Sequence, residues 1–194
     1  MLFNLEDNFY SPSDLGLMVM NFLNLPFVPS HQPNETYFGT DRLKAYPCYE
    51  TSEFKIEKNP YAPFDIFKKT LELKTGLKPF KIKTFLRKTK LSELKKSPSW
   101  NQYKPHQDDK TFDYAGIVYF NSNSLIDGTK FFHNENCFEP TAVIGSRYNR
   151  CVFYTSQVFH SPTMEQEVEE RWIQPFFLIT KEETYNNFKK NNAV

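Results

Sequence analysis

The chain has 194 residues, of which 39% are hydrophobic, 17% aromatic and 24% charged, and its net charge is +1. This length suits one buried domain rather than two, and the aromatic content excludes a disordered chain. A net charge so close to zero gives no global field for nucleic acid or an anionic membrane. The 20 phenylalanines and 11 tyrosines, against 6 glycines, favour β structure packed by rings.

Features of export or membrane insertion are missing from the sequence. The three cysteines have no CxxC spacing, which indicates neither a disulfide framework nor a zinc ribbon and makes a reducing compartment the simpler assumption. The first residues contain no basic leader, and the apolar run 15–28, interrupted by Asn21, Asn24 and Pro26, is too short to span a bilayer. We therefore expect a soluble, cytoplasmic protein with no membrane partner.

A first helix is predicted near the N-terminus. Ser13 or Asp14 can cap it, because short polar side chains accept hydrogen bonds from the first free backbone N–H groups. Apolar residues then recur at helical spacing up to Leu23, and Pro26 ends the helix.

An extended loop and a second helix are predicted to follow. Residues 27–62 are rich in Pro, Asn and Tyr, and we expect a loop with room for one short strand. An amphipathic helix is predicted over about 64–74, closed by Gly76. Residues 68–96 hold eleven Lys or Arg, which we interpret as a solvated surface, with a docking face for an acidic substrate or partner as the alternative.

From about residue 79 the pattern changes to strands. Apolar and polar residues alternate in KIKTFLRKT (81–89), and AGIVYFN (115–121) is a continuous apolar run. Three further runs are bounded by turn-prone residues: TAVIG (141–145), RCVFYTSQVF (150–159) and RWIQPFFLIT (171–180). Several short strands after N-terminal helices suggest a mainly β (α+β) fold, either a β-sandwich or a jelly roll.

We expect a single domain over residues 1–194. In this division residues 1–78 supply helical and loop support or a lid, and residues 79–180 form the jelly-roll core. Residues 181–194 contain a last polar helix, at 182–190, which we expect to be only loosely attached.

Three residues form a candidate metal site. His106 and Asp108 precede a predicted core strand, and residues i and i+2 of an extended segment point to the same side. His160 is predicted to end the strand RCVFYTSQVFH, because Ser161-Pro162 follows it. Two imidazoles and one carboxylate on one face of an octahedral ion leave three positions open, which suits Fe(II) and dioxygen chemistry.

Arg171 is a candidate carboxylate-binding residue. It begins the last predicted strand, which we expect to neighbour the strand that carries His160, so its guanidinium could reach the mouth of the barrel. The alternative is a surface ion pair with Glu169 or Glu170.

Other ionisable residues are weaker candidates. Asp109 is a rival to Asp108, but its side chain should point away from His106 in an extended segment. His133 and Glu135 form a second pair in a polar loop, which we interpret as part of a rim, and His31 carries no signal.

The chain resembles the prolyl-hydroxylase-like branch of the Fe(II)/2-oxoglutarate dioxygenases over roughly residues 80–180. A subgroup of that branch shares the strand around AGIVYFN, a turn like DGTKFF and a strand before the last histidine, and its opening helix resembles FYSPSDLGLMVMNF (9–22). The segments that carry the resemblance, in chain order, are HQD (106–108), AGIVYFN (115–121), DGTKFF (127–132), YNRCVFYTSQVFH (148–160) and RWIQPFFL (171–178).

The resemblance implies a double-stranded β-helix, or jelly roll, with supporting N-terminal helices. It also implies that His106, Asp108 and His160 hold Fe(II) and that Arg171 binds the far carboxylate of 2-oxoglutarate. The implied reaction consumes O2 and releases succinate and CO2 while a C–H bond is hydroxylated, and ascorbate is left open as an additional reductant.

The resemblance also implies roles for further residues, and at two positions this sequence differs from the pattern of the relatives. Tyr119 matches a tyrosine that donates a hydrogen bond to the same carboxylate, although any buried tyrosine needs a partner for its hydroxyl. Thr129 and Phe131 would line the pocket. Phe120 stands where relatives have leucine, and Asp127 replaces the first glycine of a GGT turn, so the conformation of that turn is open.

The resemblance also narrows the substrate. Asp108 argues against the halogenating relatives, and Phe177 stands where nucleic-acid-repair relatives carry a second arginine, which disfavours a nucleic acid partner. A protein side chain or a small molecule remains. The competing interpretations are a non-catalytic, cupin-like jelly roll that holds a structural metal or none, and a cupin-like enzyme with different metal chemistry.

Overall fold

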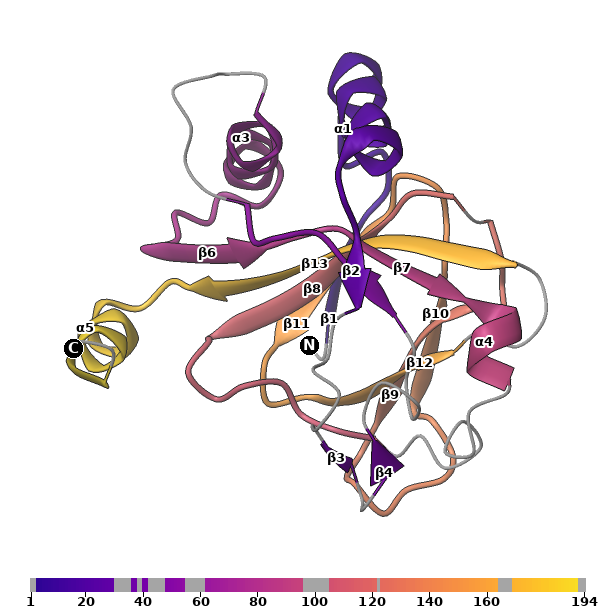
Figure 1. Cartoon of the computed structure of the whole chain (residues 1–194). Coiled ribbons are helices and arrows are strands. Elements are labelled where there is room, and N and C mark those ends of the chain that lie inside the picture. The colour runs from indigo at the N-terminus through magenta and orange to yellow at the C-terminus, as the bar shows by residue number, and fades with distance from the viewer. Residues whose placement is uncertain are drawn as a thin grey trace.

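The structure is a computed structural model, and it describes residues 3–29, 36–37, 40–41, 48–54, 62–95, 105–121, 123–163 and 169–191. Two antiparallel β-sheets lie at its centre, and helices flank the larger sheet (Figure 1). Within the described residues, no helix has the length and apolar character needed to cross a membrane.

The larger sheet is built around one long strand. Strand β13 (Glu170–Ile179) pairs with β8 on one side and with both β6 and β7 on the other. The sheet has the order β1-β11-β8-β13-β7-β5-β2, with β6 off this path. The bounds of the other strands are β1 (Phe3–Glu6), β2 (Val28–Pro29), β5 (Tyr49–Glu50), β6 (Lys81–Thr84), β7 (Arg87–Lys90), β8 (Tyr114–Tyr119) and β11 (Cys151–Thr155).

The smaller sheet has the order β10-β9-β12 and faces the larger one. An isolated antiparallel bridge from His106 to His160 adds a further chain segment beside β12. Side chains of both sheets, among them Phe131, Val152 and Ile173, form one buried cluster between them. The bounds are β9 (Gly128–Phe132), β10 (Ala142–Gly145) and β12 (Phe159–Thr163), and β3 (Thr36–Tyr37) pairs with β4 (Thr40–Asp41) in a separate hairpin. This architecture confirms the predicted mainly β jelly roll.

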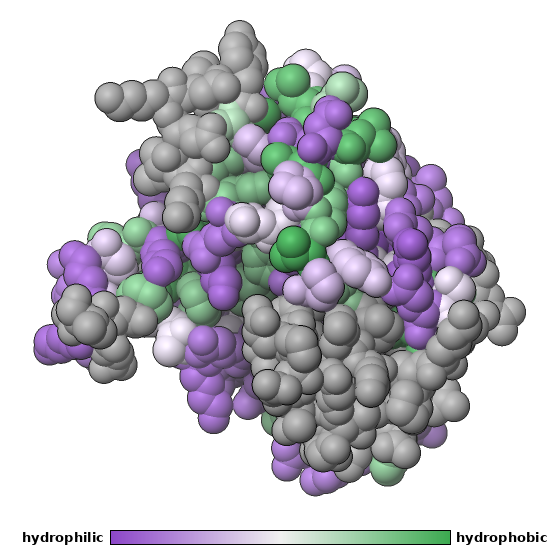
Figure 2. Space-filling model, viewed as in Figure 1, coloured by the Kyte–Doolittle hydropathy of each residue, from purple (hydrophilic) through white to green (hydrophobic). Residues whose placement is uncertain are grey.

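Two helices cover the outer face of the larger sheet, and a third lies at the C-terminal end. Helix α1 (Pro12–Asn24) and helix α3 (Pro63–Thr75) share an apolar cluster with side chains of β8 and β13 (Figure 1). Helix α4 (Leu91–Lys95) is one turn after β7, and α5 (Glu182–Asn191) follows β13. Some apolar side chains of α1 stay exposed, including Met20 and Leu23, and the top of Figure 2 shows an apolar area over this helix.

The ends of α1 and α3 test the predicted caps. The N-cap of α1 is Ser11, whose side chain accepts a hydrogen bond from the backbone N–H of Asp14, so the expectation of Ser13 or Asp14 as the cap was wrong. Pro12 occupies the first turn, where a missing backbone N–H costs nothing. The helix therefore starts nearer the N-terminus than the sequence pattern predicts. Gly76 closes α3 as predicted, with a left-handed φ of 70°.

Two predicted strands are each divided in the structure. KIKTFLRKT forms β6 and β7, and both pair with β13. The run before His160 does not end there: β11 stops at Thr155, a turn follows, and β12 begins at Phe159 in the other sheet. Proline is tolerated at position 162 because, beyond His160, β9 is the one partner of β12 within the described residues.

Asn149 ties the N-terminal segment to the turn before β11. Its backbone is left-handed, with a φ of 61°. Its side-chain oxygen accepts the backbone N–H of Tyr10 at 2.9 Å, and its side-chain nitrogen donates to the carbonyl of the same residue at 2.8 Å. Its backbone N–H donates to the carbonyl of Tyr119 at 2.8 Å, so one residue joins the N-terminal segment to β8.

A chain of buried polar groups runs along the outer face of β13. The hydroxyl of Tyr10 donates to the side-chain oxygen of Gln174 at 2.5 Å. The amide nitrogen of Gln174 donates to the hydroxyl of Thr84 at 3.0 Å, which donates to the carbonyl of Pro175 at 2.9 Å. Every member has a partner, which is the condition under which a buried polar network stabilises a fold.

Helix α5 is anchored more firmly than the sequence suggested. The carboxylate of Asp113 accepts hydrogen bonds from the backbone N–H groups of Thr180 and Lys181 at 2.7 and 2.9 Å, and from the hydroxyl of Thr184 at 2.9 Å. A carboxylate at this position satisfies free N–H groups at the start of the helix, and it also complements the helix dipole.

The basic stretch 68–96 is distributed over several elements. Lys68 and Lys90 each face a glutamate on their own chain segment at 3.9 and 3.8 Å, and Arg87 pairs with Glu50 of β5 at 2.5 Å. Lys88 lies over the rings of Phe27 and Trp172. Much of the run is thus paired locally or packed on rings, and Lys96 lies outside the described residues.

Candidate metal and carboxylate site

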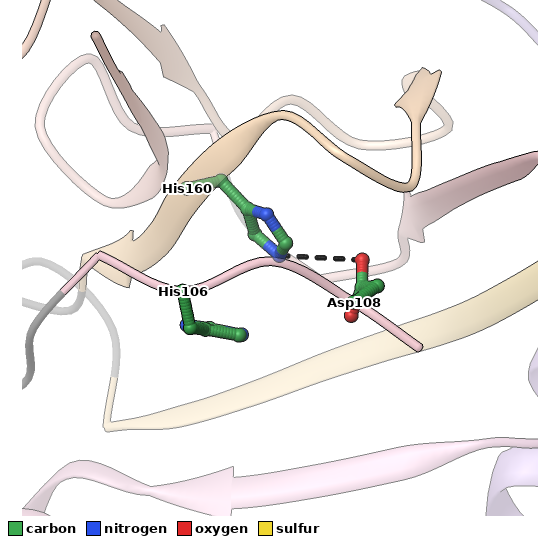
Figure 3. Close-up of side chains that lie close together, drawn as sticks. All are labelled: His106, Asp108 and His160. Carbon is green, nitrogen blue, oxygen red and sulfur yellow. Dashed lines mark ion pairs between the residues drawn. The ribbon is translucent and has the colours of Figure 1, made fainter. Parts of the chain in front are cut away.

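His106, Asp108 and His160 lie together inside the open end of the barrel. One potential ligand atom from each residue lies within 4.8 Å of those of the other two. Nε2 of His160 is 3.5 Å from Oδ2 of Asp108, and the ring centroids of the two histidines are 4.5 Å apart. Figure 3 shows the imidazole of His160 directed at the carboxylate, with His106 on the same chain segment as Asp108. Two imidazoles and a carboxylate therefore converge on one point.

Backbone pairing holds the two halves of this group together. His106 and His160 exchange two backbone hydrogen bonds of 2.9 Å each. Two residues further on, the N–H of Asp108 donates to the carbonyl of Ser156 at 3.0 Å. The segment 106–108 is therefore fixed against the residues that lead into β12, and its extended form places residues 106 and 108 on one side.

The surroundings of His160 define its protonation state. Its Nδ1 lies 3.0 Å from the carbonyl of Val158, which can only accept, so Nδ1 carries the proton in this contact. Burial lowers the pKa of His160 to about 4, so the ring is neutral at pH 7. Nε2 then presents a lone pair, which is the form in which imidazole binds a metal ion.

The pKa of Asp108 is raised by burial to about 6, although the positive charges of His106 and Arg87 oppose the rise. At pH 7 the carboxyl group is therefore mostly ionised. The contact between Asp108 and His160 is then not an ion pair at this pH, because the imidazole is neutral. Instead a carboxylate oxygen and a nitrogen lone pair face each other at 3.5 Å, an arrangement that a cation between them would stabilise.

Arg171 lies at the start of β13 with its guanidinium inside the barrel. Its side chain is 1% exposed, and its Nη2 donates to the carbonyl of Gly128 at 3.0 Å. Its Nε and Nη1 have no hydrogen-bond partner within the described residues. The guanidinium lies 5.3 Å from the ring of Tyr119, whose hydroxyl is 2.6 Å from that of Thr129. A buried cation with two free donors beside two hydroxyls is suited to a carboxylate.

The place of Arg171 differs from the sequence expectation in two ways. Its strand pairs with β6, β7 and β8, whereas His160 is on β12 of the smaller sheet. The two residues therefore belong to different sheets and do not come from neighbouring strands. Arg171 is also too deeply buried for the surface ion pair considered as its alternative.

Comparisons with solved structures place this arrangement among known folds. A prolyl-4-hydroxylase from Pseudomonas putida is similar with a TM-score of 0.58 and 9% identity, over 91% of this chain and 92% of that one. A Trichoplax adhaerens prolyl hydroxylase in complex with a hypoxia inducible factor peptide is similar with a TM-score of 0.61 and 12% identity. The match covers 95% of this chain and 86% of that one. HygX from Streptomyces hygroscopicus, with nickel and 2-oxoglutarate bound, is similar with a TM-score of 0.57 and 8% identity. The match covers 92% of this chain and 83% of that one.

The chain has the fold of the 2-oxoglutarate and Fe(II)-dependent oxygenases. No protein-family model matches it, and no curated protein does. At identities of 8–12% the likeness to the solved structures is one of fold. What the oxygenase fold does in this chain must be argued from its own side chains.

Tyr154 is a residue of this oxygenase fold that the sequence did not single out. It is buried at the inner end of β11, and its ring lies 4.7 Å from that of His160 and 5.2 Å from that of Phe131. The ring thus packs against the imidazole of His160. Alternation along CVFYT places residues 152 and 154 on one face, and this signal could have identified it.

The turn before β9 does not need the glycine that relatives carry. Asp127 is buried and its φ is not positive, so a side chain is accommodated there. Its backbone N–H donates to the hydroxyl of Ser124 at 2.8 Å, and its carbonyl accepts from Ser146 at 2.6 Å. Gly128 is the constrained position, because a Cβ there would lie 2.0 Å from the carbonyl oxygen of Ile144.

The weaker candidates stay apart from the site. Asp109 accepts a hydrogen bond from the backbone of Thr111 and is exposed. His133 and Glu135 are exposed, and neither belongs to a metal-binding group found in the part of the chain that the structure describes. His31 and most of the predicted loop 27–62, including any lid, lie outside the described residues.

Proposed function

We propose that the chain is an oxygenase that uses Fe(II) and 2-oxoglutarate and hydroxylates a C–H bond of a protein side chain or a small molecule. One observation carries the proposal. The group of His106, Asp108 and His160 shares the interior of the barrel with the guanidinium of Arg171, two of whose donors have no partner in the described structure. A metal site without a carboxylate site, or the reverse, would not favour this function.

The three ligands fit Fe(II) by their chemistry. Two imidazole nitrogen donors and one carboxylate form the facial set found in non-haem iron oxygenases, with positions left for other ligands. The contact from Nδ1 of His160 to Val158 fixes the tautomer and the orientation of the ring. Iron bound here would supply the activation of O2 that is coupled to the oxidative decarboxylation of 2-oxoglutarate.

Arg171, Tyr119 and Thr129 fit the far carboxylate of 2-oxoglutarate. The unpartnered Nε and Nη1 of Arg171 face different edges of the guanidinium, and either can donate a charge-assisted hydrogen bond to a carboxylate oxygen. The hydroxyls of Tyr119 and Thr129 are 2.6 Å apart, so one donates to the other and one O–H remains for the ligand. Burial of all three strengthens these contacts, because little water competes with them.

The rest of the barrel interior excludes water from the reacting groups. Phe131, Val152 and Ile173 are buried between the sheets in the same cluster as Tyr119 and Tyr154. Their apolar walls limit side reactions with solvent and hold the bound molecule in one orientation.

Both substrate classes agree with the fold. One similar structure is a prolyl hydroxylase in complex with a peptide fragment, and another is HygX with hygromycin B bound. A protein side chain and a small molecule are therefore both compatible with this architecture.

The decisive experiment does not require the substrate. Fe(II) and 2-oxoglutarate are titrated into the protein without oxygen, and we expect the weak visible charge-transfer band of an iron–2-oxoacid chelate. Admission of O2 should then yield succinate, even without coupled hydroxylation. Metal binding without the band or succinate would instead favour the non-catalytic, cupin-like jelly roll.

A further inference from the structure

A third unpartnered polar group lies beside the guanidinium of Arg171. Thr89 on β7 is fully buried, and its hydroxyl oxygen has no hydrogen-bond partner within the described residues. In the register of β7 and β13, Thr89 lies directly opposite Arg171. Residues opposite each other in an antiparallel pair share one face, with Cβ atoms roughly 5 Å apart. The hydroxyl therefore lies on the same buried face of the sheet as the side chain of Arg171.

A hydroxyl in this position is costly to the protein alone. A buried hydroxyl without a partner loses its hydrogen bonds to water and gains none in return. Valine has the same shape and would fill the site without that cost, so threonine is explained by a group that the protein alone does not provide. The other unpartnered atoms here, Nε and Nη1 of Arg171, are donors, so the missing group is an acceptor.

We propose that Thr89 is a further positioning residue that donates a hydrogen bond to the far carboxylate of the dicarboxylate co-substrate. The inference rests on the proposed function and adds a residue to it. A carboxylate has about four lone-pair sites. Arg171 supplies one charged donor from its unpartnered N–H groups, the Tyr119–Thr129 pair supplies the one O–H that their mutual bond leaves, and Thr89 supplies a third donor.

The donor of Thr89 comes from a different strand from the other three residues. Tyr119 is on β8, Thr129 on β9, Arg171 on β13 and Thr89 on β7, so the carboxylate joins four strands and both sheets. A ligand held in this way selects for length and charge at its far end. A 2-oxo acid without a second carboxylate would leave all of these donors unsatisfied.

The test is Thr89→Val, measured first without any ligand. We expect the unfolding temperature of the metal-free variant to equal or exceed that of the unchanged chain, because an unsatisfied buried hydroxyl is removed. In the anaerobic charge-transfer titration, its affinity for 2-oxoglutarate should fall about 10- to 100-fold, as for a lost hydrogen bond to a charged group. Its affinity for 2-oxovalerate, which has no far carboxylate, should not change.

Two further variants complete the test. Thr89→Ser restores the hydroxyl and should recover most of the affinity for 2-oxoglutarate. Thr70→Val is the matched control, because Thr70 is a buried threonine of α3 on the outer face of the larger sheet. A Thr89→Val variant that binds 2-oxoglutarate as tightly as the unchanged chain would overturn the assignment of Thr89 while leaving the proposed function intact. Failure of the unchanged chain to bind 2-oxoglutarate would overturn both.

Discussion

His106 and His160, 54 positions apart, exchange a reciprocal pair of backbone hydrogen bonds of 2.9 Å each. One β-bridge therefore fixes the backbone positions of two candidate metal ligands relative to each other.

Metal affinity should depend on pH through Asp108. Protons compete with the ion for this carboxylate, whose pKa burial raises to about 6. With Co(II) as an oxygen-stable probe, we expect nearly constant affinity above pH 7 and a loss of about tenfold per pH unit below 6. The pKa of His160, lowered by burial to about 4, should steepen the loss only near that pH. Calorimetric titrations between pH 4.5 and 8 measure this, and a flat profile would contradict the role of Asp108.

Asp108→Asn should stabilise the metal-free protein at neutral pH. The carboxyl group has a folded pKa of about 6 against 3.8 in a model compound, so ionisation favours the unfolded chain. That cost is complete above about pH 6, shrinks as the pH falls and vanishes below 3.8. The gain in free energy of unfolding should follow the same course, while Co(II) no longer stabilises the variant. Urea unfolding at pH 7.5 and pH 4 checks both expectations.

Arg171→Met should separate metal binding from co-substrate binding. Truncating one partner of a buried charged pair costs roughly 2–5 kcal/mol, so the affinity for 2-oxoglutarate should fall by about thirtyfold or more. The affinity for Co(II) should be unchanged, because Arg171 does not belong to the candidate metal-binding group of His106, Asp108 and His160. Parallel titrations with metal alone and with metal plus 2-oxoglutarate provide the comparison. An equal loss of both affinities would mean that the substitution disturbs the barrel as a whole.

Asn149→Ala should destabilise the fold by roughly 2–4 kcal/mol. Both backbone groups of Tyr10 lose their buried partners, and alanine must adopt the left-handed φ of 61°. Asn149→Gly loses the same hydrogen bonds without the backbone strain, so its cost should be lower by about 1 kcal/mol. Urea unfolding of the three proteins measures the two contributions separately, and equal stability of both variants would exclude the strain.

Asp113→Ala should release helix α5 from the sheet. Burial alone would raise the pKa of Asp113, but hydrogen bonds from Thr180, Lys181 and Thr184 outweigh it and hold the pKa below 3.8. The ionised carboxylate of Asp113 therefore stabilises the fold above pH 3.8, and this stabilisation is lost as the pH falls through the folded pKa. Loss of such a capping contact costs about 1 kcal/mol. Amide hydrogen exchange of residues 182–191 should become faster, and unchanged exchange would show that the helix is held by its other contacts.

Strand positions followed from the sequence more readily than strand partners. AGIVYFN is apolar without interruption and forms β8 as expected, since a buried strand needs apolar residues on both faces. The sequence pattern predicts RCVFYTSQVFH (150–160) as one strand, because the turn at Ser156 and Gln157 contains neither glycine nor proline. The chain changes sheets at that turn, which local pattern does not reveal.

In the candidate site too, contacts within one chain segment could be predicted from the sequence, whereas contacts between distant strands could not. The spacing of His106 and Asp108 predicts a shared side, and the structure places them so. Thr89 gave no signal, since it stands in RKTK among long charged residues that suggest exposure, yet its side chain faces inward. Burial of a small polar residue within a charged strand depends on the partner strand, here β13.

Strand β1 covers the outer edge of β11 in the larger sheet, and Tyr10 closes the polar chain along β13. A version of this protein shortened to begin at Pro12 would therefore expose the backbone of an apolar edge strand and leave the amide of Gln174 without its hydroxyl partner. Bare edges of this kind recruit other strands. Such a shortened protein would tend to self-associate through β11 before any defect in chemistry could be measured.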